Sequence, residues 1–300
     1  MIIVTYNKIP DLSNIKKAIS QGEIDALFIS DNSAREDLLE GIRNQIPVEL
    51  QKKITIIENG RNLGISAAIN IALKKAIDLG YYFIHLLDDD AIVSEHLFRT
   101  EQETFIQMLE KGYDVGAVCP LVSNNHAQME KWLSRKTISE IRNAITSGLL
   151  ISSDTITKVG YYDERYFVQL ADMEFTSRMF EKGLKIFRIN QVMISQDFGV
   201  SVKNLSVKIL PYLACSKVSN LIKRSIGRTN DVVFFARLHS PMAEYDYNAG
   251  MSQFFNITKK NILYNPTNIY HFFIPIVNDF LLFIATGDIQ YIMAIKGLVR

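Results

Sequence analysis

The chain of 300 residues has only two cysteines, Cys119 and Cys215, which lie far apart in the sequence. Their spacing matches no metal or redox motif, so we expect reduced thiols in a cytoplasmic protein. No basic segment followed by a long apolar one opens the chain, so no signal peptide is expected. No uninterrupted apolar run reaches the roughly 18 residues of a membrane-spanning helix.

The chain also lacks a large net charge. It has 33 Lys and Arg against 32 Asp and Glu, a net charge of +1, which argues against a nucleic-acid-binding protein. The charge is uneven, because residues 201–300 carry eleven basic and five acidic side chains. This basic third is either a solvated face of a helical region or a surface that contacts anionic lipid headgroups.

Short apolar runs alternate with helical patterns along the first two thirds of the chain. Strands are predicted at 2–5, 26–30, 54–58, 82–87, 115–122, 149–151, 185–189 and 192–195. Helices are predicted at 11–20, 34–46, 64–79, 94–111 and 172–182, with Ser94 as an N-cap. This alternation predicts an α/β fold with a mostly parallel sheet flanked by helices. We place a catalytic domain at 1–200 and a mainly helical C-terminal region at 201–300.

Polar loops follow the first four predicted strands, at 5–7, 31–33, 59–64 and 88–90. Because ligands bind beyond the carboxyl ends of parallel strands, these loops predict a site at one rim of the sheet. The first loop contains no glycine, which argues against a dinucleotide-binding oxidoreductase built on a similar sheet. Backbone N–H groups at the helix start after Asn62 and Gly64 could meet phosphate or ribose, or Gly64 could be only a hinge.

The acidic triplet of Asp88, Asp89 and Asp90 ends an apolar strand. Side chains alternate in extended backbone, so Asp88 and Asp90 are expected to point the same way. Carboxylates this close repel one another and suit a hard divalent cation, Mg²⁺ or Mn²⁺. The alternative is a solvated acidic turn.

A second acidic segment follows at Asp172 and Glu174, with Arg178 one helical turn beyond Glu174. Asp172 opens a predicted helix and is either a plain N-cap or a general base at the mouth of the sheet. The spacing alone leaves both interpretations open.

Taken in order, these segments resemble the motifs of glycosyltransferase family 2, especially its bacterial rhamnosyltransferases. Residues 4–7 resemble V-T-Y-N, 29–33 resemble I-V-D-N-S, and 62–70 resemble N-x-G-x-A-x-A-x-N. Residues 86–90 resemble L-L-D-Q-D, 147–152 match S-G-x-L-I-S, and 160–178 resemble G-x-F-D-E followed by D-V-E-x-x-x-R. The match covers about 2–200 and, more loosely, 254–300. One departure is Gln196, which stands where the family often has a metal-binding His.

The resemblance implies a GT-A fold and a metal-dependent inverting glycosyltransferase. It assigns Asp172 as the catalytic base, and Glu174 and Arg178 to the acceptor site or to structure. It places Mg²⁺ or Mn²⁺ on Asp90 and Asp88, with Gln196 as a further candidate ligand. It gives the nucleotide-sugar-binding residues as Thr5, Asn7, Asp31, Asn62, Gly64, Asp88 and Asp89.

The resemblance also suggests the partners. The expected donor is dTDP-rhamnose or a UDP-sugar, and the acceptor a glycan or a lipid-linked glycan of bacterial surface polysaccharide synthesis. The C-terminal third would bring the enzyme to the inner face of the cell membrane as a peripheral protein. The alternatives are a UDP-hexose-dependent transferase and a degenerate, non-catalytic nucleotide-sugar-binding protein.

Overall fold

The computed structural model describes residues 1–123, 137–168 and 171–196, and the structural statements below concern these ranges. The helical character and the membrane contact expected of residues 201–300 lie outside them. None of the helices in the described ranges is both long enough and apolar enough to cross a bilayer.

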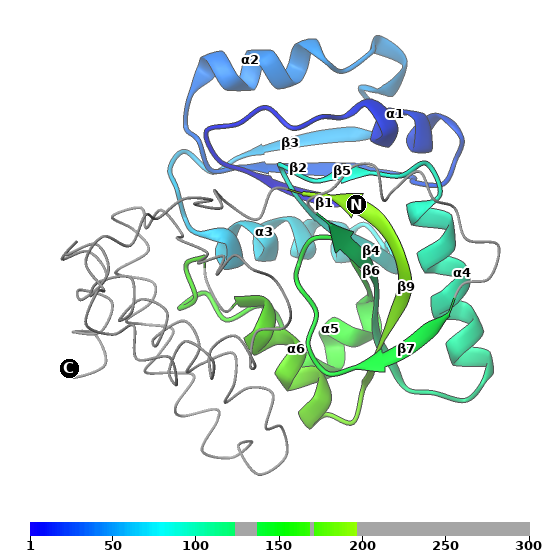
Figure 1. The fold of residues 1–300 in the computed structure, drawn as a ribbon. Helices are drawn as coiled ribbons and strands as arrows, with labels where there is room; N and C mark the ends of the chain where they lie inside the picture. Colours follow the sequence, from blue (N-terminus) through cyan, green and yellow to red (C-terminus); the bar gives the residue numbers. More distant parts are fainter. Residues whose placement is uncertain (124–136, 169–170, 197–300) are drawn as a thin grey trace, which may run out of the picture. The chain divides into compact units, whose positions relative to one another are not determined.

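One mixed sheet forms the framework, with the strand order β3-β2-β1-β4-β8-β6-β9-β5 and β7 beside β9 (Figure 1). The strands are β1 (Ile2–Thr5), β2 (Leu27–Asp31), β3 (Ile54–Glu58), β4 (Phe83–Asp88), β5 (Ile92–Val93), β6 (Val115–Ser123), β7 (Ile138–Ile141), β8 (Leu149–Ser152) and β9 (Lys185–Ser195). β3, β2, β1 and β4 pair in parallel, β8 runs antiparallel between β4 and β6, and β9 is parallel to β6. The carboxyl ends of β1, β2, β4 and β9 therefore share one edge of the sheet.

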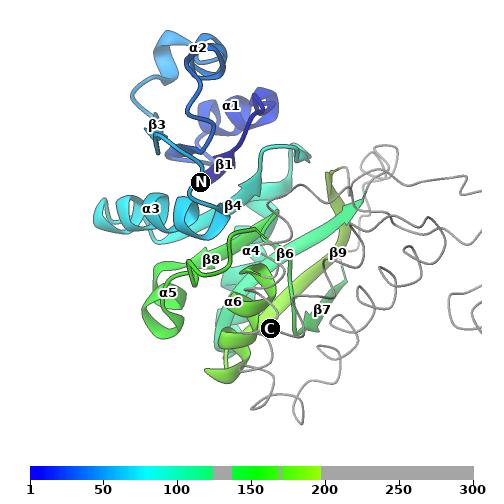
Figure 2. The ribbon, with the colours of Figure 1, turned by 90° about the vertical axis from the view of Figure 1, so that its left-hand side faces the viewer.

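Helices cover both faces of this sheet. They are α1 (Ser13–Ser20), α2 (Glu36–Asn44), α3 (Ile65–Asp78), α4 (Leu97–Glu110), α5 (Ser153–Val159) and α6 (Ala171–Glu181), with a 3₁₀ turn at Val48–Leu50. α1 and α2 lie on one side of β1–β3 and α3 on the other, as both views show (Figures 1 and 2). The α/β fold class is confirmed.

The side chains of successive strand residues pack alternately into the hydrophobic cores on the two faces of the sheet. Ile3, Ile29 and Leu87 belong to one hydrophobic cluster with α1, α2 and α4. Their neighbours Ile2 and Phe28 are equally buried but lie outside that cluster. This is the two-residue period of a sheet covered on both faces, and each fully buried side chain contributes roughly 1.5–3 kcal/mol.

Two sequence expectations are wrong. The strands predicted at 185–189 and 192–195 form a single strand, β9, because the polar Asn190 is satisfied at the sheet edge. Its backbone N–H donates to the Thr137 carbonyl oxygen at 2.9 Å, and its side-chain amide donates to Ser139 Oγ at 2.6 Å. Ser94 is not an N-cap, because α4 begins at Leu97 with His96 at the cap position. The structure also adds β5, β7 and α5, which the sequence patterns did not predict.

Candidate active site

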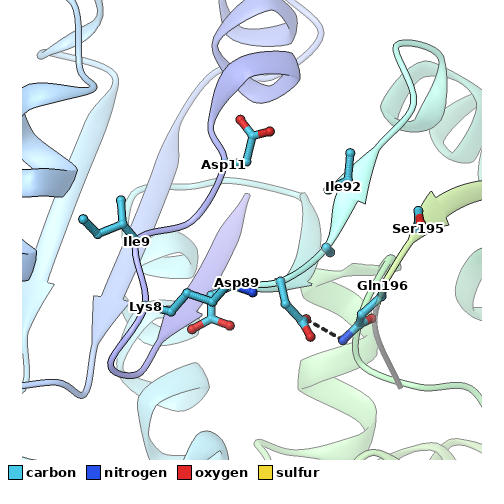
Figure 3. A pocket seen from close by; sticks show the side chains of 9 residues that line it. Lys8, Ile9, Asp11, Asp89, Ile92, Ser195 and Gln196 are labelled. Carbon is cyan, nitrogen blue, oxygen red and sulfur yellow. Dashed lines mark hydrogen bonds between the residues drawn. The ribbon is translucent and has the colours of Figure 1, made fainter. Parts of the chain in front are cut away.

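The acidic triplet meets the end of β9 at the carboxyl edge of the sheet. β5 pairs antiparallel with β9, with Ile92 opposite Ser195 (Figure 3). Asp90, two residues before Ile92, therefore lies beside Gln196. Gln196 Nε2 donates hydrogen bonds to Asp88 Oδ2 at 2.9 Å and to Asp90 Oδ1 at 2.7 Å. Asp88 and Asp90 therefore point to the same side, and one side-chain amide bridges them.

The electrostatic environment of the triplet opposes the accumulation of negative charge. Burial raises the pKa of Asp88 to about 6, the hydrogen bond from Gln196 opposes that rise, and the charges of Asp90, Asp172 and Asp89 add to it. Burial also raises the pKa of Asp89, whose Oδ2 accepts a hydrogen bond from the Tyr6 backbone N–H at 3.0 Å. Asp89 thus ties the triplet to the loop after β1.

The donor set around Gln196 fits a hard cation. Within the described ranges, no group of three or more His, Cys, Asp or Glu side chains could hold a metal ion. Gln196, however, adds a third oxygen, Oε1, which is buried and has no hydrogen-bond partner among the residues that the structure describes. A half-turn of the amide exchanges its nitrogen and oxygen, so Oε1 would then face Asp88 and Asp90. Three oxygens suit Mg²⁺ or Mn²⁺, which also take oxygen ligands from phosphate.

A cavity of about 210 Å³ opens beside this bridge (Figure 3). The loop after β1 forms one wall, and the triplet, β5 and the end of β9 form the other. Its lining residues are Lys8, Ile9, Asp11, Asp89, Asp90, Ala91, Ile92, Ser195 and Gln196. The charge of Lys8 lowers the pKa of Asp89, against the larger effect of burial. The cavity therefore combines one cationic group with several carboxylates.

The loops after β1 and β2 are held together around Asp31. Asp31 Oδ1 accepts a hydrogen bond from Thr5 Oγ1 at 2.9 Å, and Oδ2 accepts the backbone N–H groups of Ser33 and Ala34 at 3.2 and 3.3 Å. The Asn7 backbone N–H donates to Ser33 Oγ at 2.8 Å. These three hydrogen bonds fix the orientation of Asp31, which is 1% exposed.

A buried amide network behind this loop was missed by the sequence analysis. The Asn32 side chain is 2% exposed; its Oδ1 accepts from Asn59 Nδ2 at 2.9 Å, and its Nδ2 donates to the Gly64 carbonyl oxygen at 3.1 Å. The network joins the ends of β2 and β3 to the start of α3. Asn32 lies inside the quoted I-V-D-N-S motif. Its burial between two loops depends on the tertiary structure and could not be predicted from the sequence.

The start of α3 is packed against the loop at 160–168. The Ile65 backbone N–H donates to the Phe167 carbonyl oxygen at 2.6 Å, and Asn62 Oδ1 accepts from the Gly64 N–H at 3.0 Å. Gly64 has φ +83°, and a Cβ there would lie 2.6 Å from Phe167 O. Gly64 is therefore required by a close approach, and the Ile65 amide is used within the protein. The nucleotide-binding roles of Asn62 and Gly64 stay predictions.

Asp172 is the second residue of α6, with its Oδ1 accepting the Met173 N–H at 2.8 Å. Its charge contributes to the raised pKa of Asp88, so these two carboxylates act on each other. The role of Asp172 as a general base stays a prediction.

Glu174 and Arg178 form an ion pair on α6. Arg178 Nη2 donates to Glu174 Oε2 at 2.8 Å, and the guanidinium also donates to the carbonyl oxygens of Val159 and Tyr161 at 2.7 and 2.8 Å. Glu174 is only 5% exposed. The pair fastens α6 to the turn that follows α5, so that Asp172 is held at the sheet edge.

Known proteins similar to this chain are glycosyltransferases. Residues 1–168 match the family described as Glycosyl transferase family 2. The dTDP-rhamnosyl transferase RfbF of Shigella flexneri is 23% identical over 223 residues, 69% of this chain and 72% of RfbF.

Solved structures share the fold. The mannosyltransferase PcManGT from Pyrobaculum calidifontis, in complex with GDP-Man and Mn²⁺, matches 95% of this chain and 72% of its own, with a TM-score of 0.51 and 12% identity. GalNAc-T7, crystallised with UDP, GalNAc and Mn²⁺, matches 65% of this chain with a TM-score of 0.50 and 13% identity, but the match spans only 43% of GalNAc-T7.

Proposed function

The chain belongs to glycosyl transferase family 2, and on that premise we propose that it is a metal-dependent inverting enzyme that transfers L-rhamnose from dTDP-rhamnose. The acceptor would be a glycan or a lipid-linked glycan of bacterial surface polysaccharide synthesis, modified in the cytoplasm at the inner face of the membrane. The observation that carries the proposal is the pairing of Asp88 and Asp90 on one Gln196 amide, with the charge of Asp172 acting on Asp88.

The donor nucleotide would bind along the carboxyl edge of the sheet. Asp31, oriented by Thr5 and two backbone amides, would accept a hydrogen bond from the base. Asn7 and the start of α3, at Asn62 and Gly64, would line the rest of the nucleotide-binding site. Asp88, Asp90 and the oxygen of Gln196 would hold Mg²⁺ or Mn²⁺, which supplies positive charge for the departing diphosphate. The Mn²⁺ in the two structural relatives supports this part of the proposal.

Asp172 would act as the general base of the transfer. Its carboxylate takes the proton from the acceptor hydroxyl while that oxygen forms a bond to the anomeric carbon. The bond from that carbon to the diphosphate oxygen breaks at the same time, and its electron pair leaves with the nucleoside diphosphate. A single displacement inverts the anomeric centre. Glu174 and Arg178 contribute by fixing α6.

The choice of donor is tested by binding. The RfbF relative supports a thymidine-linked rhamnose, whereas the UDP bound to GalNAc-T7 keeps a UDP-hexose as the alternative. A thermal-shift panel would compare dTDP, UDP and GDP, each with and without Mg²⁺ or Mn²⁺, because a ligand of the folded state raises its stability. A metal-dependent shift with dTDP is expected. A shift only with UDP would redirect the donor assignment to a UDP-hexose, and no shift with any nucleotide would contradict the binding of a nucleotide sugar.

A further inference from the structure

Lys8 is the cationic side chain among the described residues that line the cavity beside the acidic triplet. It belongs to the loop after β1, and its side chain extends from that loop toward Asp89 (Figure 3). In the described part of the chain, the lysine salt bridges are those of Lys17, Lys158 and Lys185, so no carboxylate there holds the ammonium group of Lys8 in an ion pair. A cation at the wall of a cavity is thus left for a ligand.

The backbone before Lys8 is fixed to two other segments of the site. The Tyr6 N–H donates to Asp89 Oδ2 at 3.0 Å, and the Asn7 N–H donates to Ser33 Oγ at 2.8 Å. Asn7 has φ +54°, a left-handed conformation that Asn tolerates better than most residues. This turn and its two hydrogen bonds determine where the chain enters the cavity wall.

The backbone after Lys8 is fixed to α2. The side chain of Ile9 occupies the space that a Cβ at Gly41 would need. The carbonyl oxygen of Pro10 accepts a hydrogen bond from Gln45 Nε2 at 3.2 Å. With both flanking segments held, the position of the Lys8 backbone is set before a ligand binds, and only the side chain has to be ordered. Such preorganisation lowers the entropic cost of binding.

The carboxylates that line the cavity already accept hydrogen bonds within the protein. Asp11 Oδ1 accepts from the Ser13 N–H at 2.9 Å, and Asp90 Oδ1 accepts from Gln196 Nε2 at 2.7 Å. The oxygens of a diphosphate can only accept hydrogen bonds, so they need a donor or a cation. The three N–H donors of the Lys8 ammonium group meet that need.

The positive groups would face a ligand from two walls of the cavity. Lys8 lies on the wall formed by the loop after β1, whereas Asp90 and Gln196, which would hold the cation of the proposed function, lie on the opposite wall. The oxygens of one phosphate group point in different directions, so the same group can contact a divalent cation on one side and an ammonium group on the other. Lysine binds phosphate as a point charge and needs no paired geometry.

We propose that the ammonium group of Lys8 binds the diphosphate of the donor and stabilises it as the leaving group. The inference rests on the proposed function and extends it to the side of the diphosphate that the cation does not contact. When the bond to the anomeric carbon breaks, its electron pair stays on the diphosphate oxygen and adds negative charge there. A cation already in place stabilises that charge more than it stabilises the intact donor.

The test compares nucleoside diphosphates with the monophosphates of the same nucleosides. Isothermal titration in the presence of Mg²⁺ would measure dTDP and dTMP, and UDP and UMP, with the full chain. For the better-bound diphosphate, Lys8→Met should weaken binding by about 10-fold, the effect of losing a hydrogen bond between charged groups. Binding of the corresponding monophosphate should change much less. Lys8→Arg keeps the charge and should recover most of the lost affinity.

Lys17→Met is the matched control. It removes the same charge from α1, but Lys17 is paired with Glu95 at 2.5 Å and does not line the cavity. This variant should bind both nucleotides like the wild type. Lys8 is exposed, so Lys8→Met should melt near the wild-type temperature. The difference in diphosphate affinity between wild type and Lys8→Met should shrink at about 1 M salt, where the Debye length is only about 3 Å.

Four results would overturn the inference. Unchanged diphosphate binding by Lys8→Met means that Lys8 serves only as a counter-ion of Asp89. An equal loss with the monophosphate means that Lys8 contacts the nucleoside part. An equal loss in Lys17→Met means that the net charge of the protein, and not this site, sets the affinity. A loss in Lys8→Arg as large as in Lys8→Met means that the charge is not what binds. If the wild type binds none of the four nucleotides, the proposed function itself fails, and the inference falls with it.

Discussion

Replacing Gln196 by Met tests the bridge between Asp88 and Asp90. Met keeps the length and approximate volume of Gln but cannot donate a hydrogen bond. Two hydrogen bonds to charged groups, each worth about 1.5–3 kcal/mol, are lost. The loss is limited because Asp88, with a pKa of about 6, can take up a proton at pH 7 for about 1.4 kcal/mol. We therefore expect the free energy of unfolding to fall by about 2 kcal/mol without metal.

The pH dependence of this loss follows from the same pKa. A carboxyl whose folded pKa lies above its ordinary value of 3.8 destabilises the fold increasingly as pH rises from 3.8 through about 6. Without the hydrogen bond from Gln196, the pKa of Asp88 rises further, so stability continues to fall at higher pH. The difference between wild type and Gln196→Met should thus grow with pH.

Urea denaturation with and without Mn²⁺ is the assay. A cation that binds Asp88 and Asp90 replaces the amide, so Mn²⁺ should narrow the difference between the two proteins. Gln191→Met is the control, because Gln191 is buried on β9, the strand that ends just before Gln196, and the two hydrogen bonds to the acidic triplet come from Gln196. A loss in Gln196→Met that is independent of pH and of Mn²⁺, or matched by Gln191→Met, would refute the reasoning.

Three further predictions concern catalysis, backbone geometry and a buried carboxyl. Asp172→Asn should lower kcat by about 10²–10⁴-fold with unchanged nucleotide binding; near-normal turnover in a rate assay would remove Asp172 as the base. Gly64→Ala should cost about 2–4 kcal/mol in urea denaturation, because φ is +83° and the new Cβ meets a backbone oxygen at 2.6 Å. Gly60→Ala, with φ +68° and open space, should cost only about 1 kcal/mol, and equal losses would contradict the steric argument. Glu101 is fully buried, and burial raises its pKa, so wild-type stability should fall as pH rises above 4.5. Burial lowers the pKa of His85 to about 3, which makes stability rise with pH only up to about 6.5. Glu101→Gln should therefore have a flatter pH profile of stability than wild type above pH 6.5, and an unchanged slope there would contradict the raised pKa of Glu101.

Part of the fold follows from local patterns. The apolar runs at β1 and β3 coincide with the observed strands Ile2–Thr5 and Ile54–Glu58. Each helix expected in the described ranges is present to within a few residues. Local periodicity suffices here because strands covered by helices on both faces are continuously apolar and each helix carries one buried stripe.

The errors in the predicted strands have a common cause. Asn190 interrupts an apolar run, and from the sequence alone it indicates a turn. In the structure its side-chain amide is hydrogen-bonded to β7, a strand that begins some 50 residues earlier in the chain. Likewise, the short strand β5 exists only because β9 pairs with it. Sequence patterns do not encode such partners, because pairing between distant segments is set by packing and register.

The candidate site, like the fold, was predicted only in part from the sequence. The sequence by itself determined the acidic triplet, its position at a strand end, and the expectation that Asp88 and Asp90 point together. Only the tertiary structure brought Gln196 to those carboxylates across 108 and 106 residues. The physical reason is that the direction of a side chain along a strand is a local property of the backbone. Which side chains meet depends on the order of the strands in the sheet and on the helices packed against it.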